Sequence, residues 1–244
     1  MSHIRIDVEN LAFEYESGKK VLKDITFHAA EGDSVGLIGA NGVGKSTLLK
    51  MLVGLNLHFT GSIRVEEIPV EKNTLAEIRS RIGYVFQDSD SQLFMNTAYE
   101  DVAFAPRNYG LSEPEVARRV EQALRLTGIE HLKERQIYKM SGGEKKLVSI
   151  ATILSMTPDI ILMDEPSVAL DPKNRRNLIH ILNSFDHLKI IASHALDLIL
   201  DTCKRTILMA NGTIIADGKT EEILTDQELL EKYNLELPLC LQRR

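Results

Sequence analysis

Nine consecutive residues have the types and spacing of a phosphate-binding loop. The sequence GANGVGKST matches the pattern G-x-x-x-x-G-K-[ST] in full and follows an apolar run that is typical of a buried strand. Glycines let backbone N–H groups close around phosphate oxygens, and the following helix N-terminus adds its dipole. In such a loop Lys45 reaches the β- and γ-phosphates, and Ser46 ligates Mg²⁺. The residues predicted to bind a nucleoside triphosphate are Gly39, Ala40, Asn41, Gly42, Val43, Gly44, Lys45, Ser46 and Thr47.

Two acidic residues stand side by side at the end of a second apolar run. Ile160–Met163 form the run, and Asp164 and Glu165 follow it. This is the Walker B pattern, in which the aspartate holds Mg²⁺, commonly through water. Open α/β sheets place their ligands at the carboxyl ends of strands, so Glu165 is suited to orient or deprotonate an attacking water. A strand that merely ends in two acids is the alternative, and the intact loop upstream argues against it.

A second glycine pair opens a predicted helix far downstream. In Ser141-Gly142-Gly143-Glu144 the serine and the glutamate form a capping box, each satisfying a backbone donor. The box does not explain two glycines in a first helical turn, where each costs about 1 kcal/mol relative to Ala. Glycines there indicate that something approaches the backbone closely, and helix N-termini bind anions. The chain therefore binds either two nucleotides or one nucleotide from two sides.

The elements that must position these residues alternate between strands and helices. Strands are predicted at His3–Glu9, Lys20–His28, Ser34–Gly39, Arg81–Phe86, Asp159–Met163 and Lys189–Ala192. Helices are predicted at Gly44–Gly54, within Thr97–Lys139, at Ser141–Met156 and from Thr220 onward. A capping box is expected at Ser112 and Glu115. A hairpin is expected over Arg205–Asp217, with its turn at Asn211-Gly212.

Composition and charge exclude several classes of function. The 244 residues include 29 basic and 35 acidic side chains, a net charge of −6, with no basic run longer than a pair. Nucleic acid is not an expected partner, because that affinity comes largely from clustered Lys and Arg. Cys203 and Cys240 make no disulfide framework and suit a reducing cytosol. No stretch approaches the ~18 apolar residues of a membrane span, so any action at a membrane is expected to pass through a partner.

The order of the motifs resembles that of the ATPase subunits of ABC transporters over nearly the whole chain. The matching residues are Tyr15 for stacking on adenine, the loop Gly39–Thr47, Gln87 of the Q-loop, the signature MSGGE at 140–144, Walker B at 161–166, Asp171 in the D-loop, and the switch histidine His194. Singly, Tyr15, Gln87 and His194 have ordinary structural explanations. Their joint order is what identifies the chain as a member of this family.

The resemblance implies ATP and Mg²⁺ as cofactors and a catalytic set of Glu165, His194 and Gln87. It implies Ser46, Gln87 and Asp164 as the Mg²⁺ ligands. In this family two ATPase domains stack head to tail, and the signature of one covers the γ-phosphate held by the other. Ser141, Gly142, Gly143 and Glu144 would then serve the nucleotide of a partner, which is a second copy of the chain or a homologous ATPase.

The signature departs from the family pattern at two positions. It usually begins with Leu and ends with Gln, whereas this chain has Met140 and Glu144. Met for Leu is a packing change at similar volume. Glu144 lacks the amide donor and adds negative charge near phosphate. We therefore expect Ser141, Gly142 and Gly143 to contact the phosphate and Glu144 not to do so directly.

The segment at residues 88–111 is similar to that of energy-coupling-factor (ECF) importers. DSDSQLFMNTAYEDVAFAPRNYGL resembles their pattern, although Asp88-Ser89 replaces the usual Asn-Pro and Ala105 the usual Gly. The ending LELPLCLQRR resembles the short ATPases dedicated to cobalt or nickel. This implies an ATPase that energises cobalt or nickel import. The alternative is an ABC transporter for another solute, such as a vitamin or an amino acid.

These observations predict an α/β fold, a P-loop NTPase core with an N-terminal antiparallel β subdomain and an inserted α-helical subdomain. Residues 1–86 and 157–244 would form the core, and 87–156 the helical signature subdomain, within one ABC ATPase domain. The protein is expected on the cytoplasmic face of the membrane, as a peripheral subunit. Integral membrane subunits would dock near Gln87–Phe94, where Leu93 and Phe94 are apolar neighbours in a polar stretch. A core contact is the alternative for that pair.

Other classes fit the sequence less well. A DNA-repair or chromosome ATPase of the same superfamily would carry a long coiled-coil insertion between the Walker motifs. A translation-type ABC protein would carry two cassettes, and a small-molecule P-loop kinase would have no signature or D-loop. A binding module without catalysis would lack Glu165 or His194.

Overall fold

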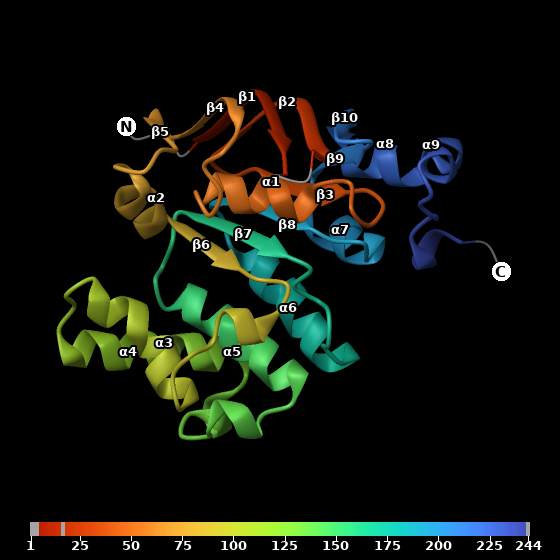
Figure 1. Cartoon of the computed structure of the whole chain (residues 1–244). Coiled ribbons are helices and arrows are strands. Elements are labelled where there is room, and N and C mark those ends of the chain that lie inside the picture. Colours follow the sequence, from red (N-terminus) through yellow and green to blue (C-terminus); the bar gives the residue numbers. More distant parts are fainter. Residues whose placement is uncertain (1–4, 16–17, 243–244) are drawn as a thin grey trace. The chain divides into compact units, whose positions relative to one another are not determined.

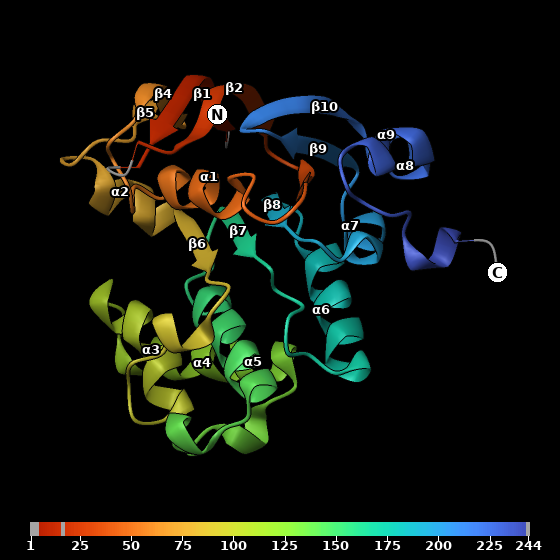
Figure 2. The same cartoon turned by 45° about the vertical axis from the view of Figure 1, so that its right-hand side comes forward.

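The computed structural model describes residues 5–15 and 18–242 of the chain, whose helices and strands are drawn in Figures 1 and 2. The chain divides into two compact units. The first consists of Met1–Ile82, Asp159–Asp164 and Asp186–Arg244, and the second of Gly83–Pro158 and Glu165–Phe185. The predicted helical subdomain, 87–156, falls within the second unit, which also includes 165–185. The division at 86/87 and 156/157 stays a prediction.

The first unit contains a mainly parallel sheet whose strands run in the order β10-β9-β3-β8-β7. Neighbours β9, β3, β8 and β7 are parallel, while β10 is antiparallel to β9. Every residue of β3, β7 and β8 is buried, as the continuous apolar runs predict. The bounds are β3 (Ser34–Ile38), β7 (Ile160–Asp164), β8 (Leu188–Ala192), β9 (Arg205–Ala210) and β10 (Thr213–Lys219).

The predicted hairpin and the predicted N-terminal β part are both confirmed. β9 and β10 join at Asn211 and Gly212, which have φ values of 53° and 80°, as an Asn-Gly turn requires. A second, antiparallel sheet has the order β2-β1-β4-β5. Its strands are β1 (Arg5–Glu14), β2 (Lys20–Ala30), β4 (Thr60–Val65) and β5 (Ile68–Pro69). Residues 3 and 4 of the predicted first strand lie outside the described residues.

Helix α1 (Lys45–Leu52) lies between the two sheets of the first unit in both views (Figures 1 and 2). Its buried face consists of Leu48, Leu49, Met51 and Leu52. The other helices of this unit are α2 (Leu75–Arg81), α7 (Leu196–Thr202), α8 (Thr220–Thr225) and α9 (Gln227–Lys232), with a short 3₁₀ turn, η4 (Leu239–Leu241). Among the described helices, none combines the length and the hydrophobicity that crossing a bilayer requires.

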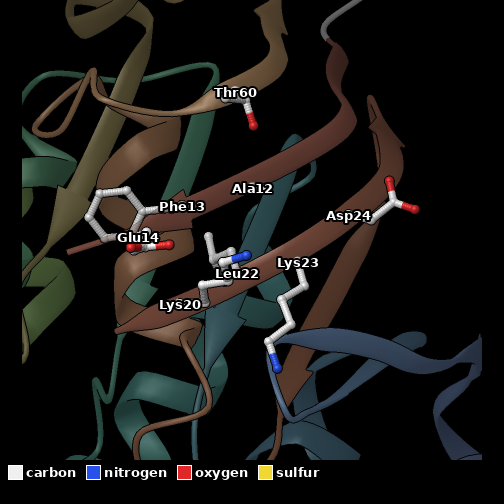
Figure 3. A pocket seen from close by; sticks show the side chains of 8 residues that line it. All are labelled: Ala12, Phe13, Glu14, Lys20, Leu22, Lys23, Asp24 and Thr60. Atoms are coloured by element: carbon white, nitrogen blue, oxygen red, sulfur yellow. The ribbon is translucent and has the colours of Figure 1, made fainter. Parts of the chain in front are cut away.

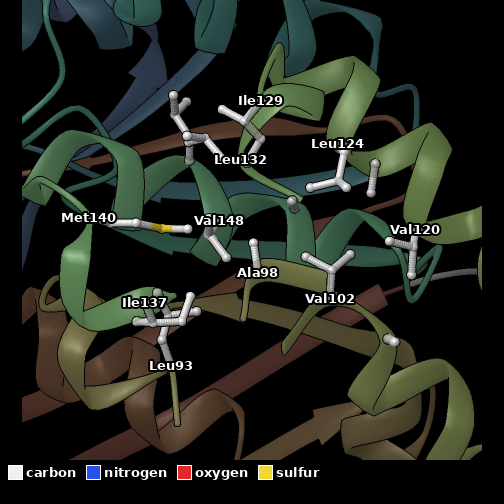
Figure 4. Packing of buried hydrophobic residues seen from close by; sticks show 14 of the residues in the cluster. Leu93, Ala98, Val102, Val120, Leu124, Ile129, Leu132, Ile137, Met140 and Val148 are labelled. Atoms are coloured by element: carbon white, nitrogen blue, oxygen red, sulfur yellow. The ribbon is translucent and has the colours of Figure 1, made fainter. Parts of the chain in front are cut away.

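The second unit is helical. β6 (Ile82–Val85) leads the chain into it, and its helices are α3 (Ala98–Asn108), α4 (Glu113–Thr127), α5 (Gly142–Leu154) and α6 (Pro172–Ser184). Three short 3₁₀ turns connect them: η1 (Ser89–Ser91), η2 (Glu130–Leu132) and η3 (Ile137–Lys139). Figure 4 shows the apolar cluster at its centre, where Val102, Val120 and Val148 come from α3, α4 and α5.

Two local predictions in this unit are wrong. Leu93 is only 7% exposed and packs in the central cluster, so it is a core residue and not a docking residue (Figure 4). Ser112 stands at the N-cap of α4, but its side chain caps nothing, and the predicted box with Glu115 does not form. Arg118 and Arg119 hold the Glu115 carboxylate instead, and they lower its pKa to about 2.

Candidate active site

The phosphate loop lies at the start of α1, and the Lys45 side chain bonds back to the first residues of the loop. The Lys45 ammonium donates to the carbonyl oxygens of Gly39 at 2.6 Å and Ala40 at 3.3 Å. Gly39 and Gly44 have positive φ, and a Cβ on them would lie 2.3 Å from the Met209 carbonyl oxygen and 2.6 Å from a Leu22 methyl group. These two positions therefore accept only glycine, on grounds of packing as well as dihedral angle.

Ser46 and Asp164 meet although 118 residues separate them. The Ser46 hydroxyl donates to the Asp164 carboxylate at 2.9 Å. A hydroxyl and a carboxylate are hard oxygen ligands, the kind that Mg²⁺ takes together with substrate phosphates. In the part of the chain that the structure describes, no group of three or more His, Cys, Asp or Glu side chains could hold a metal alone. Because Mg²⁺ takes such oxygen ligands together with substrate phosphates, the Ser46–Asp164 pair suits an ion that arrives with a nucleotide.

Strand register brings further predicted residues to the same sheet edge. Ala192, at the end of β8, pairs with Leu37 of β3 and with Asp164 of β7. The three strands are parallel, so their carboxyl ends coincide, and the phosphate loop and Asp164 lie at that edge. His194 follows β8 by two residues and therefore belongs to it. This is the edge where open α/β sheets bind ligands.

Tyr15 lies at the far end of the phosphate loop. Its hydroxyl is 3.2 Å from the hydroxyl of Thr47, and its ring meets the ring of Phe13 edge-on with centroids 4.7 Å apart. The side chain is 47% exposed. A partly exposed aromatic ring beside the loop is available for stacking on a base. The structure thus brings Tyr15 together with the loop in the first unit.

A separate pocket of about 530 Å³ opens on strands β1, β2 and β4 of the antiparallel sheet (Figure 3). It is lined by apolar Phe13 and Leu22 and by charged Glu14, Lys20 and Asp24. No residue of the phosphate loop lines it. The pocket is therefore not the predicted nucleotide site.

The signature lies at the start of α5 in the second unit, and its capping box is confirmed. The Ser141 hydroxyl accepts from the Glu144 backbone N–H at 3.3 Å, and the Glu144 carboxylate accepts from the Ser141 N–H at 2.7 Å. The other oxygen of that carboxylate accepts from Arg135 at 3.1 Å. The Ser141 N–H is the main cause that lowers the pKa of Glu144. Both oxygens thus accept hydrogen bonds from their own chain, and the absence of a direct contact between Glu144 and phosphate stays a prediction.

The two signature glycines are not equivalent. A Cβ on Gly143 would lie 2.8 Å from the Ala169 carbonyl oxygen, whereas a Cβ on Gly142 would lie 3.6 Å from the Ala169 methyl group, an ordinary contact. Gly143 is therefore required by its own chain. Only Gly142 could carry a side chain without displacing its neighbours.

The segment after β7 carries the other catalytic prediction. Glu165 has φ 48° and Ala169 has φ 68°, a conformation that costs a residue with a side chain roughly 1 kcal/mol. The Asp171 carboxylate accepts from the Asn174 N–H at 2.8 Å and so caps α6. Glu165 and Asp171 lie in the second unit, as does Gln87. Of the predicted Mg²⁺ ligands, the structure therefore brings Ser46 and Asp164 together within one unit, and it places Gln87 in the other.

Lys146 is a buried charged residue that the sequence motifs do not single out. It is 2% exposed, and its ammonium donates to the carbonyl oxygens of Phe86 and Gln87. The signal was available, because Lys146 lies one turn before Ile150 and two before Ile153 on the buried face of the predicted helix. A lysine in an apolar helical stripe requires a polar partner.

Comparison with known sequences agrees with this geometry. The family described as ABC transporter matches residues 22–168. A putative ABC transporter ATP-binding protein of Geobacter sulfurreducens is 48% identical over 99% of this chain and 97% of its own length. The energy-coupling factor transporter ATP-binding protein EcfA of Carboxydothermus hydrogenoformans is 37% identical over 98% of this chain and 90% of its own.

Comparison with solved structures gives the same family. CbiO1 of Clostridium perfringens, described as part of the ABC transporter complex CbiONQ, has TM-score 0.80 and 36% identity over 98% of this chain and 97% of its own. The ATP-binding cassette MJ0796, in a dimeric structure with ADP and Pi, has TM-score 0.82 and 26% identity over 88% and 98%. The chain therefore belongs to the ABC transporter family as an ATPase subunit, close to those of the energy-coupling-factor type.

Proposed function

We propose that the chain energises an ECF-type importer of cobalt or nickel ions as a head-to-tail ATPase dimer. The observation that carries the catalytic part is the 2.9 Å pairing of Ser46 with Asp164 beside a closed phosphate loop. The resemblance of residues 88–111 to the ATPases of ECF importers supports the transporter type. The similarity to CbiO1 agrees with an assembly of this kind.

The first unit would hold ATP. The Lys45 ammonium, which donates to loop carbonyls, is positioned to donate to phosphate oxygens at the same loop. Ser46 and Asp164 would hold Mg²⁺, which neutralises the phosphate charge that develops during hydrolysis. Glu165 adjoins Asp164 in the chain, so its carboxylate would orient the attacking water and accept its proton, with Gln87 and His194 completing the site.

The second unit would cover the nucleotide of the partner. Gly142 and Ser141 stand at the N-terminus of α5, a 13-residue helix whose first N–H groups favour an anion. The Ala169 carbonyl of the same chain fills the space beside Gly143. Gly142 has no such close neighbour, so another molecule could approach it. The two glycines would therefore be needed for different reasons. Gly143 makes room for its own chain, and Gly142 makes room for the nucleotide of the partner.

A membrane subunit would dock on the loop that presents Phe94. Phe94 is 65% exposed and meets Phe104 edge-on, with ring centroids 4.7 Å apart. The Asp101 carboxylate holds this loop by accepting from the N–H groups of Phe94 and Met95, both at 3.2 Å. An exposed aromatic ring on a braced loop suits a partner helix. Leu93, being in the core, is not part of this surface.

Co-purification from native membranes tests the proposal. Phe94→Ser should lose the membrane subunits while folding and basal ATPase persist, because the ring is exposed and the loop keeps its Asp101 contacts. Leu126→Ser, which removes an apolar side chain that is 44% exposed on α4, is the matched control and should keep the subunits. Retention of the subunits by Phe94→Ser would refute docking at this loop.

The same preparations test the cargo. Elemental analysis of the complex from cells supplied with cobalt and nickel should find one of these ions above the level in a Phe94→Ser preparation. A complex that carries neither metal but retains an organic solute would contradict the metal assignment. In that case the ATPase would serve the alternative class, a transporter for another solute.

A further inference from the structure

Lys146 is the most unusual charged residue of the second unit, because it is large, charged and 2% exposed. Its ammonium donates to the Phe86 carbonyl oxygen at 2.9 Å and to the Gln87 carbonyl oxygen at 2.6 Å. Burying an ammonium is strongly unfavourable unless hydrogen bonds replace its hydration. The Q-loop backbone is therefore held by a group that cannot easily release it.

A second side chain ties the same segment to α5. The Gln92 side-chain oxygen accepts from the Phe86 N–H at 3.1 Å, and its amide nitrogen donates to the Ser149 carbonyl and the Thr152 hydroxyl, both at 2.8 Å. Phe86 is thus held through its N–H by Gln92 and through its carbonyl by Lys146. The segment and the helix are fastened at two successive turns of α5.

Lys145, the neighbour of Lys146, makes a different kind of contact. Its ammonium lies 2.5 Å from the carboxylate of Asp90, whose side chain is 67% exposed. Ion pairs of such exposure contribute little, typically less than about 1 kcal/mol. Of the two adjacent lysines, Lys146 therefore makes buried hydrogen bonds to the backbone, whereas Lys145 makes an ion pair with an exposed carboxylate.

We propose that Lys146 is a positioning residue that fixes the backbone of Gln87 against the helix that begins at the signature. The inference rests on the proposed role of Gln87 in the site. Lys146 lies on the first turns of the helix that opens with Ser141 and Gly142. Through Lys146, Gln87, which is proposed to act on the chain's own nucleotide, and Ser141 and Gly142, which are proposed to bind the partner's nucleotide, would move as one element.

A double-mutant cycle on the full chain tests this. Lys146→Met should lower kcat by about 10-fold and raise the Mg²⁺ concentration for half-maximal activity, while KM for ATP changes by less than about 3-fold. Combined with Gln87→Ala, it should cost no more than Gln87→Ala alone, because both remove one function. Lys145→Met should stay within about 3-fold of wild type.

Hydrogen exchange tests the contact between Lys146 and the Phe86 and Gln87 carbonyls independently of ATPase activity. Amides of residues 86–92 should exchange about 10-fold faster in Lys146→Met than in wild type, while the amides of α5 keep their wild-type exchange rates. Lys146→Gln, whose amide keeps a donor, should fall between the two, and it replaces Lys146→Met if that variant melts early. Unchanged exchange, or effects of Lys146→Met and Gln87→Ala that multiply, would overturn the proposal. Wild-type turnover in Gln87→Ala, with faster exchange in Lys146→Met, would instead refute the role of Gln87 in the proposed site.

Discussion

Glu165→Gln should bind ATP with wild-type affinity while its turnover falls by about 10²–10⁴-fold, the range for loss of a general base. The substitution keeps the shape of the side chain and removes its negative charge, and with it the ability to accept a proton. Phosphate release measures turnover, and equilibrium titration with a fluorescent ATP analogue measures affinity. The binding groups Lys45, Ser46 and Asp164 are untouched, so affinity should not change.

Lys45→Ala is the contrasting control. It removes the ammonium that lies at the phosphate loop, so ATP binding itself should weaken. Near wild-type turnover in purified Glu165→Gln would show that Glu165 is not the base. His194, at the same sheet edge, would then be the leading candidate.

Two variants that are inactive alone should restore activity when mixed. Lys45→Ala damages the phosphate loop, and Gly142→Asp places a carboxylate against the partner's phosphate. In a mixed dimer, one chain supplies a sound loop and the other a sound signature, so one site is whole. With random pairing and independent sites, mixing recovers at most about a quarter of wild-type ATPase, because half the dimers are mixed and each has one site.

Gly142 and Gly143 differ in the space that their own chain leaves for a side chain. Asp at Gly143 would meet the Ala169 carbonyl of its own chain, so that variant would disturb the segment after Glu165. A Cβ at Gly142 meets only the Ala169 methyl group, at 3.6 Å, and an aspartate suits a first helical turn. Gly142→Asn, with the same shape and no charge, is the matched control and should impair ATPase less. A mixture no more active than its components would show that the sites are not shared.

The phosphate loop, the buried strands and the Asn-Gly hairpin were predictable because their signals are local. Ser112 shows the limit of a local signal. A capping box needs the carboxylate at N3 to be available, and Arg118 and Arg119 hold the Glu115 carboxylate one turn later. Thr97 and Glu100 form a capping box at the start of α3, which the sequence motifs do not single out.

Leu93 and Gly143 could not be assigned from the sequence because their neighbours are distant in it. The polar residues around Leu93 suggest exposure, yet it belongs to the same buried cluster as Val148, 55 positions later (Figure 4). The sequence shows that the signature glycines lower helix propensity. It does not show that the Ala169 carbonyl is the reason for the glycine at position 143. Contacts across the helical unit decide both positions.

Light scattering on the Glu165→Gln chain tests the central claim, that the second glycine pair completes a nucleotide site of a partner. With Mg-ATP, the mass of Glu165→Gln should double from the 27.4 kDa of one chain, because the bound nucleotide is not hydrolysed and holds two chains together. Glu165→Gln carrying Gly142→Asp should stay at the mass of one chain, since a carboxylate would face the phosphate. If it dimerised as readily as Glu165→Gln alone, the signature would not be an interface element, and the capping box and the Ala169 contact would be its whole role.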